Sequence, residues 1–323
     1  MRGCVVSLAI PGIKIKSKKR LKSQKSENFI ATDSLSSGST VGTVVAFHGT
    51  PGSHNDFKYI RQILDTCGVR FIGVNYPGFR HTPGYTDQQH VNAERQSYSN
   101  ALLQEINVSG GLCGKLIALG HSRGCENALM TAISFQTDGL IMVNPVGLRE
   151  HKMIRPLSKL RRIETTYNYL PKFIANPLLY KMSRSAGLKV QDGEEAISSL
   201  KAVIRCGLHE NLPYIHKFNE QDTKTCIIFA GNDHVVEREV IFESLQEYKG
   251  LKHFNFGSEI PDPANILNTF HSEKGATVFI EQDTHYQNKK RADLVANVVK
   301  KIFEVTEKPN SKFESELAET KKI

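Results

Sequence analysis

Six short apolar segments rich in β-branched residues recur along the chain, each bounded by turn residues and none with a strict apolar–polar alternation. Continuous apolar runs of this kind are typical of strands buried on both faces of a parallel sheet. Helix-like stretches lie between them, so the pattern predicts an α/β fold with a mostly parallel, doubly wound sheet. The expected strands are 43–47, 70–75, 115–119, 139–143, 225–230 and 276–281, and the expected helices are 56–67, 92–106, 125–135 and 238–248.

The alternation of strand and helix stops at about residue 147 and resumes at about residue 225, and the intervening periodicity is helical. An all-helical insertion between two strands would lie over the carboxyl ends of the strands, where open α/β folds bind ligands. We therefore expect a lid. The predicted organisation is a basic N-terminal arm or edge strand at 1–26, an α/β core at 27–146 and 225–305, a helical lid at 147–224 and a polar tail at 306–323.

The net charge of +9 is concentrated at the N-terminus, because residues 1–26 hold eight Lys/Arg and no acidic residue. The rest of the chain is nearly neutral, which argues against nucleic-acid binding by a basic folded face. The arm resembles a mitochondrial transit peptide in composition. Its segment "IKIKS" alternates apolar and basic residues, and this pattern favours an edge strand protected by lysines.

No apolar run reaches the ~18 residues that a membrane span requires. The six cysteines are scattered without a C-x-x-C pair, which is typical of reduced thiols, so we predict a cytoplasmic protein with a mitochondrial location as the alternative. No metal-ligand cluster or phosphate-binding loop is present in the sequence, and we predict neither a metal nor another cofactor. The pattern makes no prediction about oligomeric state.

The segment "KLIALGHSRGCENALM" places Ser122 within G-x-S-x-G, directly after a predicted strand and before a predicted helix. This context is that of a nucleophile elbow, in which the serine occupies a strained turn and Gly120 and Gly124 relieve the crowding around it. The sequence therefore predicts Ser122 as a nucleophile. His121 adjoins it in the sequence, but neighbouring residues of a tight turn point in different directions, so we predict a structural role for His121.

A serine hydroxyl needs a base that takes its proton and an acid that orients the base. His285 follows the last predicted strand and precedes a long amphipathic helix, so it is the predicted base. The acid should follow a strand between serine and histidine. Asp233 lies three residues past such a strand, whereas Asn144, after another, cannot carry a negative charge. Asp283, two residues before His285, is the second candidate.

The segment "HGTPG" joins an early strand to a helix and carries little side chain, as a loop must if its amides are to approach a reacting group. The Thr50 N–H and the Arg123 N–H are the predicted oxyanion donors, since the second donor of such sites follows the nucleophile. We expect His48 and Gly49 to hold the turn of this loop.

These segments together resemble the α/β-hydrolase fold superfamily over residues 27–305, and "HGTPGSHNDFKYI" and "GHSRGCENAL" resemble a group of uncharacterised α/β hydrolases of nematodes. The resemblance implies the triad and the oxyanion loop and no particular substrate. Three departures stand out. Arg123 replaces a commonly apolar residue, Arg80 replaces a usual glycine, and the long separation of Asp233 from His285 predicts an insertion within 254–275 near the pocket entrance.

The sequence thus predicts a serine hydrolase that cleaves an ester-type bond, with a small acyl substrate that is a carboxylic ester, a lipid or a thioester. A non-catalytic ligand-binding protein with the same fold is the alternative. The stretch 149–162 carries six Lys/Arg and one Glu. It could bind the anionic head of an amphiphilic substrate whose tail enters beneath the apolar residues 167–180, or it could be a solvated helix face.

Overall fold

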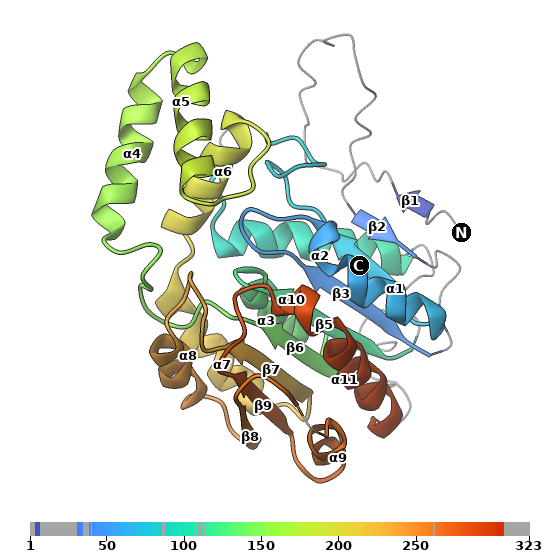
Figure 1. Ribbon diagram of the computed structural model, residues 1–323. Helices are drawn as coiled ribbons and strands as arrows, with labels where there is room; N and C mark the ends of the chain where they lie inside the picture. The colour runs from blue at the N-terminus through green and yellow to red at the C-terminus, as the bar shows by residue number, and fades with distance from the viewer. Residues whose placement is uncertain are drawn as a thin grey trace.

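The computed structural model describes residues 4–6, 31–34, 39, 41–85, 88–108, 112, 114–260 and 262–306. Over these residues the chain forms one nine-stranded sheet with the strand order β1-β2-β4-β3-β5-β6-β7-β9-β8 (Figure 1). The strands are β1 Cys4–Val6, β2 Ala31–Asp33, β3 Thr43–Phe47, β4 Arg70–Val74, β5 Leu116–His121, β6 Gly139–Val143, β7 Lys224–Ala230, β8 Leu251–Phe256 and β9 Gly275–Ile280.

Every neighbouring pair from β4 to β8 is parallel, whereas β2 runs antiparallel to both β1 and β4. The six strands predicted from continuous apolar runs are confirmed to within two residues, because their side chains are buried on both faces of the sheet. β8 was not predicted, since its exposed Lys252 and His253 interrupt the apolar pattern at the edge of the sheet. At the other edge, the predicted strand within "IKIKS" lies outside the described residues.

Two helical layers cover the sheet (Figure 1). Successive residues of β3 point to opposite layers, so that Val44 packs with one layer and Val45 with the other. One layer contains α1 Lys58–Thr66, α9 Ala264–Ser272 and α11 Ala292–Val305, and the other contains α2 Asn92–Val108, α3 Gly124–Ser134, α7 Leu212–Asn219 and α8 Arg238–Leu245. The architecture is the predicted doubly wound, mostly parallel α/β sheet.

A helical insertion follows β6 and consists of α4 Leu157–Tyr169, α5 Lys172–Ser185 and α6 Gly193–Ile204. It has a small apolar core of its own, made by Tyr167, Ala175, Leu179, Val190, Ala196 and Ile197. In contrast, Ile215 and Phe218 of α7 belong to the main core beside α3. The separate helical unit therefore ends before α7, earlier than the predicted boundary at residue 224, because α7 packs onto the sheet layer.

Contrary to the prediction from the sequence, the residues between Asp233 and His285 do not form an insertion at the pocket entrance. They complete the sheet instead: β8 adds the outer parallel strand, and α9 crosses back to the start of β9. Ile266 and Phe270 of α9 are fully buried in the same core cluster as α11. The long separation in the sequence is therefore one additional strand and helix on the flank of the sheet.

Candidate active site

A tight turn between β5 and α3 carries Ser122 at the carboxyl edge of the sheet. Ser122 has a φ of +53°, a left-handed backbone conformation that side chains with a Cβ rarely adopt. Its N–H donates to the Val143 carbonyl at 2.9 Å, and its own carbonyl accepts from the Cys125 N–H at 3.0 Å. These bonds hold the strained serine, and strain of this kind is concentrated at functional sites.

The two glycines of the G-x-S-x-G segment are required by close approach of backbone. A Cβ at Gly124 would overlap the carbonyl of Phe47 in β3, and one at Gly120 would overlap the backbone of Cys125. α3 can therefore start directly against β3 and β5 only if both positions are glycine. This packing aims the amino end of α3 at Ser122.

Ser122, His285 and Asp233 form a continuous hydrogen-bonded chain. His285 Nε2 lies 2.9 Å from Ser122 Oγ, and His285 Nδ1 lies 2.7 Å from Asp233 Oδ2. Because a carboxylate can only accept, Nδ1 carries the proton of the neutral imidazole and Nε2 is free to accept from the serine. Residues from three separate strand ends are thus brought into the arrangement that the sequence predicted.

The Asp233 carboxylate is held by its loop as well as by His285. Burial by itself would raise its pKa, but hydrogen bonds from His285 and from the amides of Val235 and Val236 lower the pKa below its ordinary value. Asp233 is therefore ionised at neutral pH. A fixed negative charge beside Nδ1 is what an imidazole needs in order to become protonated in the same place.

The carboxylate of Asp283, the second candidate for the acid, binds basic side chains and not His285. Its oxygens accept from Arg291 at 2.7 and 3.0 Å, and Lys290 Nζ lies 2.6 Å from the same carboxylate. The Asp283 carbonyl accepts from the Asn232 N–H at 3.0 Å, which joins the loop before His285 to the loop that carries Asp233. Asp283 thus connects the two loops and does not contact the imidazole.

Two side chains hold the backbone of His285 in place. His121 Nε2 and Asn144 Nδ2 both lie 3.0 Å from the His285 carbonyl oxygen. Burial, with the nearby His285 as a smaller cause, lowers the pKa of His121 to about 3, so His121 is neutral and donates this bond. Asn144 also accepts from the Ala230 N–H at 3.0 Å. Asn144 cannot serve as the acid, but from its position after β6 its side chain supports the backbone of His285.

The "HGTPG" loop lies against the serine turn, since a Cβ at Gly49 would lie 2.9 Å from the Ser122 Cβ. His48 is buried, and burial is the main cause that lowers its pKa well below the ordinary value. Its Nδ1 donates to the Gly49 carbonyl at 2.7 Å and its Nε2 accepts from the Tyr76 N–H at 3.2 Å. In the described part of the chain, no carbonyl accepts a hydrogen bond from the Thr50 or Arg123 amide.

Arg95 of α2 supports the same loop and was missed from the sequence. It is 2% exposed, and its guanidinium donates to the His48 carbonyl at 3.1 Å and to Thr50 Oγ1 at 3.2 Å. The guanidinium carbon also lies 3.9 Å from the centre of the Tyr76 ring. One arginine in a helix of mixed polar and apolar residues forms no sequence pattern, so the sequence did not identify Arg95 as a site residue. The role of Arg95 follows from its hydrogen bonds to the loop that contains His48 and Thr50.

We expect Arg95→Lys to lower kcat for a p-nitrophenyl ester by about 10- to 100-fold with KM changed less than about threefold, because a lysine cannot hold both loop positions. Steady-state kinetics and a melting curve measure this. Arg61→Lys in α1, where Arg61 is half-buried and its Nε lies 3.8 Å from Asp65 Oδ2, is the matched control and should have wild-type kinetics. A loss of kcat that only follows a loss of folded protein would contradict a positioning role for Arg95.

The two arginine departures from the family pattern, Arg123 and Arg80, are accommodated locally. Arg123 is buried, and its Nη2 donates to the His90 carbonyl at 2.8 Å and to Asn92 Oδ1 at 3.0 Å, so its side chain extends toward the start of α2. Arg80 has a φ of +35°, in the region that favours glycine, and its Nη2 donates to the Lys189 carbonyl at 3.1 Å. Neither side chain displaces Ser122, His285 or Asp233.

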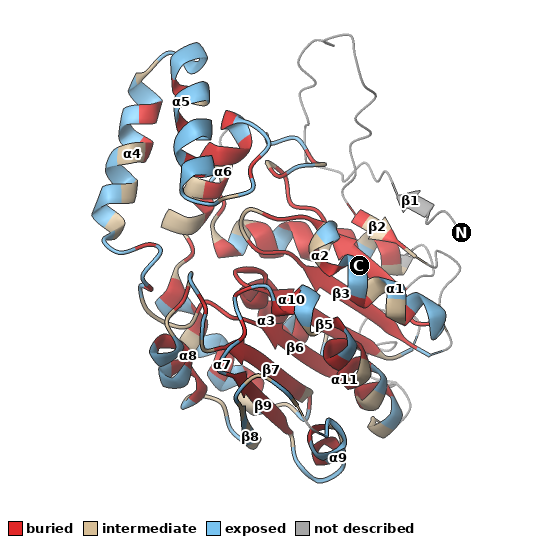
Figure 2. Ribbon diagram, viewed as in Figure 1, coloured by how far each residue is buried: buried red, intermediate tan, exposed pale blue. Residues whose placement is uncertain are grey.

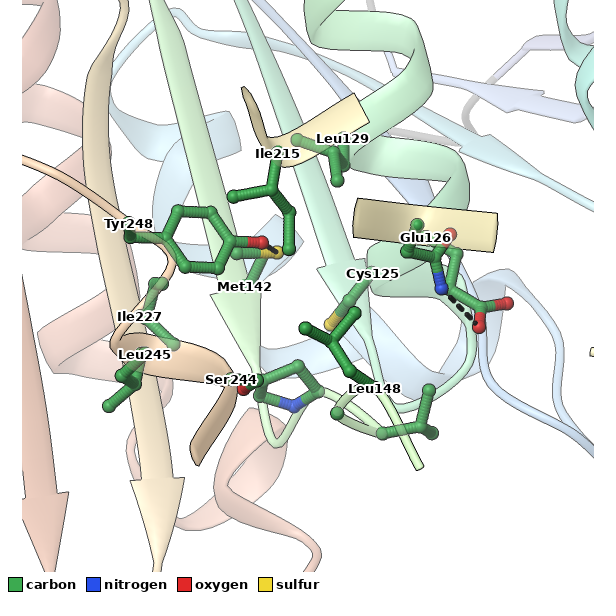
Figure 3. A pocket seen from close by; sticks show the side chains of 14 residues that line it. Cys125, Glu126, Leu129, Met142, Leu148, Ile215, Ile227, Ser244, Leu245 and Tyr248 are labelled. Atoms are coloured by element: carbon green, nitrogen blue, oxygen red, sulfur yellow. Dashed lines mark hydrogen bonds between the residues drawn. The ribbon is translucent and has the colours of Figure 1, made fainter. Parts of the chain in front are cut away.

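A small cavity lies between α3, the segment that follows β6, α7 and α8 (Figure 3). Its volume is about 30 Å³, and its walls are mostly apolar, with Cys125, Leu129, Met142 and Tyr248 among them. This space could hold one or two water molecules and is too small for an acyl group. A larger cleft of about 390 Å³ lies between the loop that contains Gly78 and His90 and the helices of the insertion.

Ser122, His285 and Asp233 are not among the residues that line this larger cleft, but its His90 accepts at its carbonyl from the side chain of Arg123, the residue after Ser122. The volume of the cleft is within the range of small-molecule sites. Its lining includes Arg80, Lys172 and Lys201 together with the carboxylates of Asp192, Glu194 and Glu195. The cleft is therefore polar with both signs of charge.

The basic stretch 149–162 is not a continuous surface above this cleft. Arg149 forms an ion pair with Glu243 within α8, Arg155 forms one with Glu237 just before α8, and Lys152 Nζ donates to the Asp233 carbonyl. Three of its six basic residues therefore bind the start of the insertion to the α/β core. The other three basic residues of this stretch, Lys159, Arg161 and Arg162, belong to α4 and are available for another role.

The sheet order, the strained serine after β5 and the hydrogen-bonded His285 and Asp233 define an α/β hydrolase. Residues 13–304 match the model of the family described as "Alpha/beta hydrolase of unknown function (DUF1057)", and the chain belongs to this family. It is 26% identical over 304 residues to a Caenorhabditis elegans protein named "Uncharacterized protein F35H12.5", with 87% of this chain and 82% of that protein covered.

Solved structures share the fold at low sequence identity. An esterase from Exiguobacterium antarcticum is similar with a TM-score of 0.56 and 14% identity, over 85% of this chain and 94% of that one. A monoacylglycerol lipase from Paleococcus ferrophilus is similar with a TM-score of 0.51 and 13% identity, over 81% of this chain and 95% of that one. These likenesses support the fold.

The helices and the metal-ligand residue types of the described part of the chain complete the description of the structure. None of these helices combines the length and the apolar character that crossing a bilayer requires. Among the described residues, no group of three His, Cys, Asp or Glu side chains is placed to hold a metal ion.

Proposed function

We propose that this protein is a serine hydrolase that cleaves an ester-type bond of a small acyl substrate through an acyl-enzyme. The observation that carries the proposal is the chain of hydrogen bonds of 2.9 and 2.7 Å from Ser122 through His285 to Asp233. A serine, a base and an oriented acid at hydrogen-bond distance are the requirements for nucleophilic catalysis by a hydroxyl group.

In the first half of the reaction, Ser122 Oγ attacks the carbonyl carbon of the ester while its proton passes to His285 Nε2. Asp233 stabilises the imidazolium that results. The C–O bond to the leaving alcohol then breaks, and the alkoxide takes the proton from His285. The product of this half-reaction is a Ser122 ester and a free alcohol, or a free thiol where the substrate is a thioester.

In the second half, a water molecule attacks the acyl-enzyme, with His285 taking one of its protons and returning it to Ser122 Oγ as the carboxylic acid leaves. Each tetrahedral intermediate carries a negative oxygen. The Thr50 and Arg123 amides are the proposed donors to this oxygen, and each such donor contributes about 3 kcal/mol. The amino end of α3 adds a favourable dipole at the same place.

The helical insertion is the proposed lid, and the cleft beneath it is the proposed entrance for the substrate. The cleft lies between the insertion and the loop that follows β4, on the side where the Arg123 side chain meets His90. The esterase and lipase neighbours favour carboxylic esters as the substrate class.

Labelling with a fluorophosphonate tests this proposal, because this electrophile reacts with an activated serine and needs no knowledge of the substrate. We expect one adduct, located on Ser122 by mass spectrometry of the peptide, and no adduct in His285→Ala. Absence of an adduct in protein shown to be folded by circular dichroism would overturn the proposal and favour a ligand-binding protein that retains the fold.

A further inference from the structure

The α4–α5 pair presents large apolar side chains to the solvent at its turn. Tyr169 is 85% exposed at the end of α4, and Phe173 is 79% exposed at the start of α5. Ile174, Leu178 and Met182 of α5 are also exposed. Isolated apolar residues on a surface need no explanation, but two nearly uncovered aromatic side chains beside a row of aliphatic ones mark an interaction site.

The exposed row is a defined helix face, because Ile174, Leu178 and Met182 are four residues apart and so lie on one side of α5. The inner side of the same helix is already packed: Ala175 and Leu179 are buried with Tyr167 in the core of the insertion. α5 is therefore held in place by its inner face, and the outer apolar face is not needed for folding of the insertion.

The exposed surfaces of the same two helices are basic. α4 and α5 carry six exposed Lys/Arg and no exposed carboxylate, since Glu164 is buried and paired with Arg205. None of the six forms an ion pair with a carboxylate within the described residues. The bases are Lys159, Arg161, Arg162, Lys172, Lys181 and Arg184.

The pair also projects from the body of the protein. In Figure 1 the two helices rise beyond the sheet, with their connecting turn at the end far from it, and in Figure 2 their outward surfaces are mostly exposed. A partner with a large, flat surface could therefore contact Tyr169 and Phe173 without contacting the sheet or its covering helices. Protruding apolar side chains with flanking bases are suited to a flat, negatively charged surface.

We propose that the α4–α5 pair binds the surface of an anionic phospholipid bilayer. Phe173 and Tyr169 enter the boundary between headgroups and acyl chains, where aromatic side chains are favoured, and the exposed bases of the two helices, most of them about two to three turns from these aromatic residues, attract the negatively charged surface. A second copy of this chain is the less favourable occupant, because a symmetric contact through the pair would bring two sets of six bases together. This proposal does not depend on the proposed catalysis.

Flotation of the full-length protein with lipid vesicles tests the proposal. We expect binding to vesicles of phosphatidylcholine with about 30% phosphatidylserine, little binding to phosphatidylcholine alone, and weaker binding as the salt concentration rises. Phe173→Ser should lower the vesicle partition coefficient about tenfold, and Arg161→Gln with Arg162→Gln should lower it about 20-fold.

Matched controls lie on the body of the protein. Tyr59→Ser removes a 49% exposed aromatic side chain from α1, and Lys58→Gln with Lys300→Gln removes two exposed bases. Both controls should leave vesicle binding unchanged, and every variant should keep the wild-type melting temperature. Wild-type vesicle binding by the Phe173 and Arg161/Arg162 variants would overturn the proposal, as would a dimer in light scattering that Phe173→Ser dissociates.

Discussion

Replacing Ser122 by alanine is expected to lower kcat for p-nitrophenyl acetate and butyrate by about 10⁴-fold or more, because the nucleophile and its acyl-enzyme are lost while the fold is kept. Ser122 lies in a strained turn whose bonds to Val143 and Cys125 are made by its backbone, so the alanine variant should fold. Steady-state hydrolysis with purified wild-type and variant protein measures the effect.

Ser134→Ala, at the exposed far end of α3, is the matched control for this substitution and should keep wild-type turnover. Equal rates of wild type and Ser122→Ala above the uncatalysed reaction would show that another group carries out the hydrolysis. Hydrolysis by neither protein, for short and long acyl chains and for thioesters, would favour ligand binding without chemistry.

Asp233→Asn is expected to lower kcat by about 10⁴-fold, since an amide leaves the imidazole without a charged partner and stabilises the wrong tautomer. The amides of Val235 and Val236 can still bond to the asparagine oxygen, so the loop should keep its conformation. The measurement is kcat for the same esters together with the melting temperature. A decrease of less than about tenfold would mean that Asp233 does not orient His285.

Asp283→Asn is the matched comparison, and its expected effect is on stability. The substitution leaves Arg291, which is mostly buried, without its carboxylate, and breaking such a pair costs about 3 kcal/mol. The folded fraction should retain most of its turnover, because Asp283 does not contact His285. If Asp283→Asn reduced kcat more than Asp233→Asn, the assignment of the acid would be reversed.

The same pair predicts how stability depends on pH. Burial by itself would raise the pKa of Asp283, but hydrogen bonds from Arg291, Lys290 and Gln287 outweigh burial and lower it below the ordinary value. A carboxyl group with a lowered pKa in the folded state stabilises the protein above its unfolded pKa of about 4 and loses this contribution as the pH falls further. Acid should therefore destabilise the wild type more steeply than Asp283→Asn, as measured by urea denaturation between about pH 5 and pH 2.

Local patterns in the sequence were sufficient to locate the central strands and the serine turn. Apolar runs located the six central strands, because strands buried on both faces must be apolar throughout. The G-x-S-x-G segment located the serine turn, because the close contacts of Gly120 and Gly124 with neighbouring backbone exclude any side chain there. The order of strands then placed Asp233 and His285 at the same edge of the sheet, since parallel strands end on one side.

The contacts between polar side chains could be assigned only from the folded chain. Asp283 is closer to His285 in the sequence than Asp233 is, but Arg291 and Lys290 bind it. Asn144 and Arg95 support the site from elements distant in the sequence. One of two interpretations from the sequence placed a substrate tail beneath the apolar residues 167–180, of which Tyr169 and Phe173 are exposed. The physical reason is that a side chain's partner depends on the direction it takes from a folded backbone, and this direction is set by packing over the whole molecule rather than by neighbouring residues.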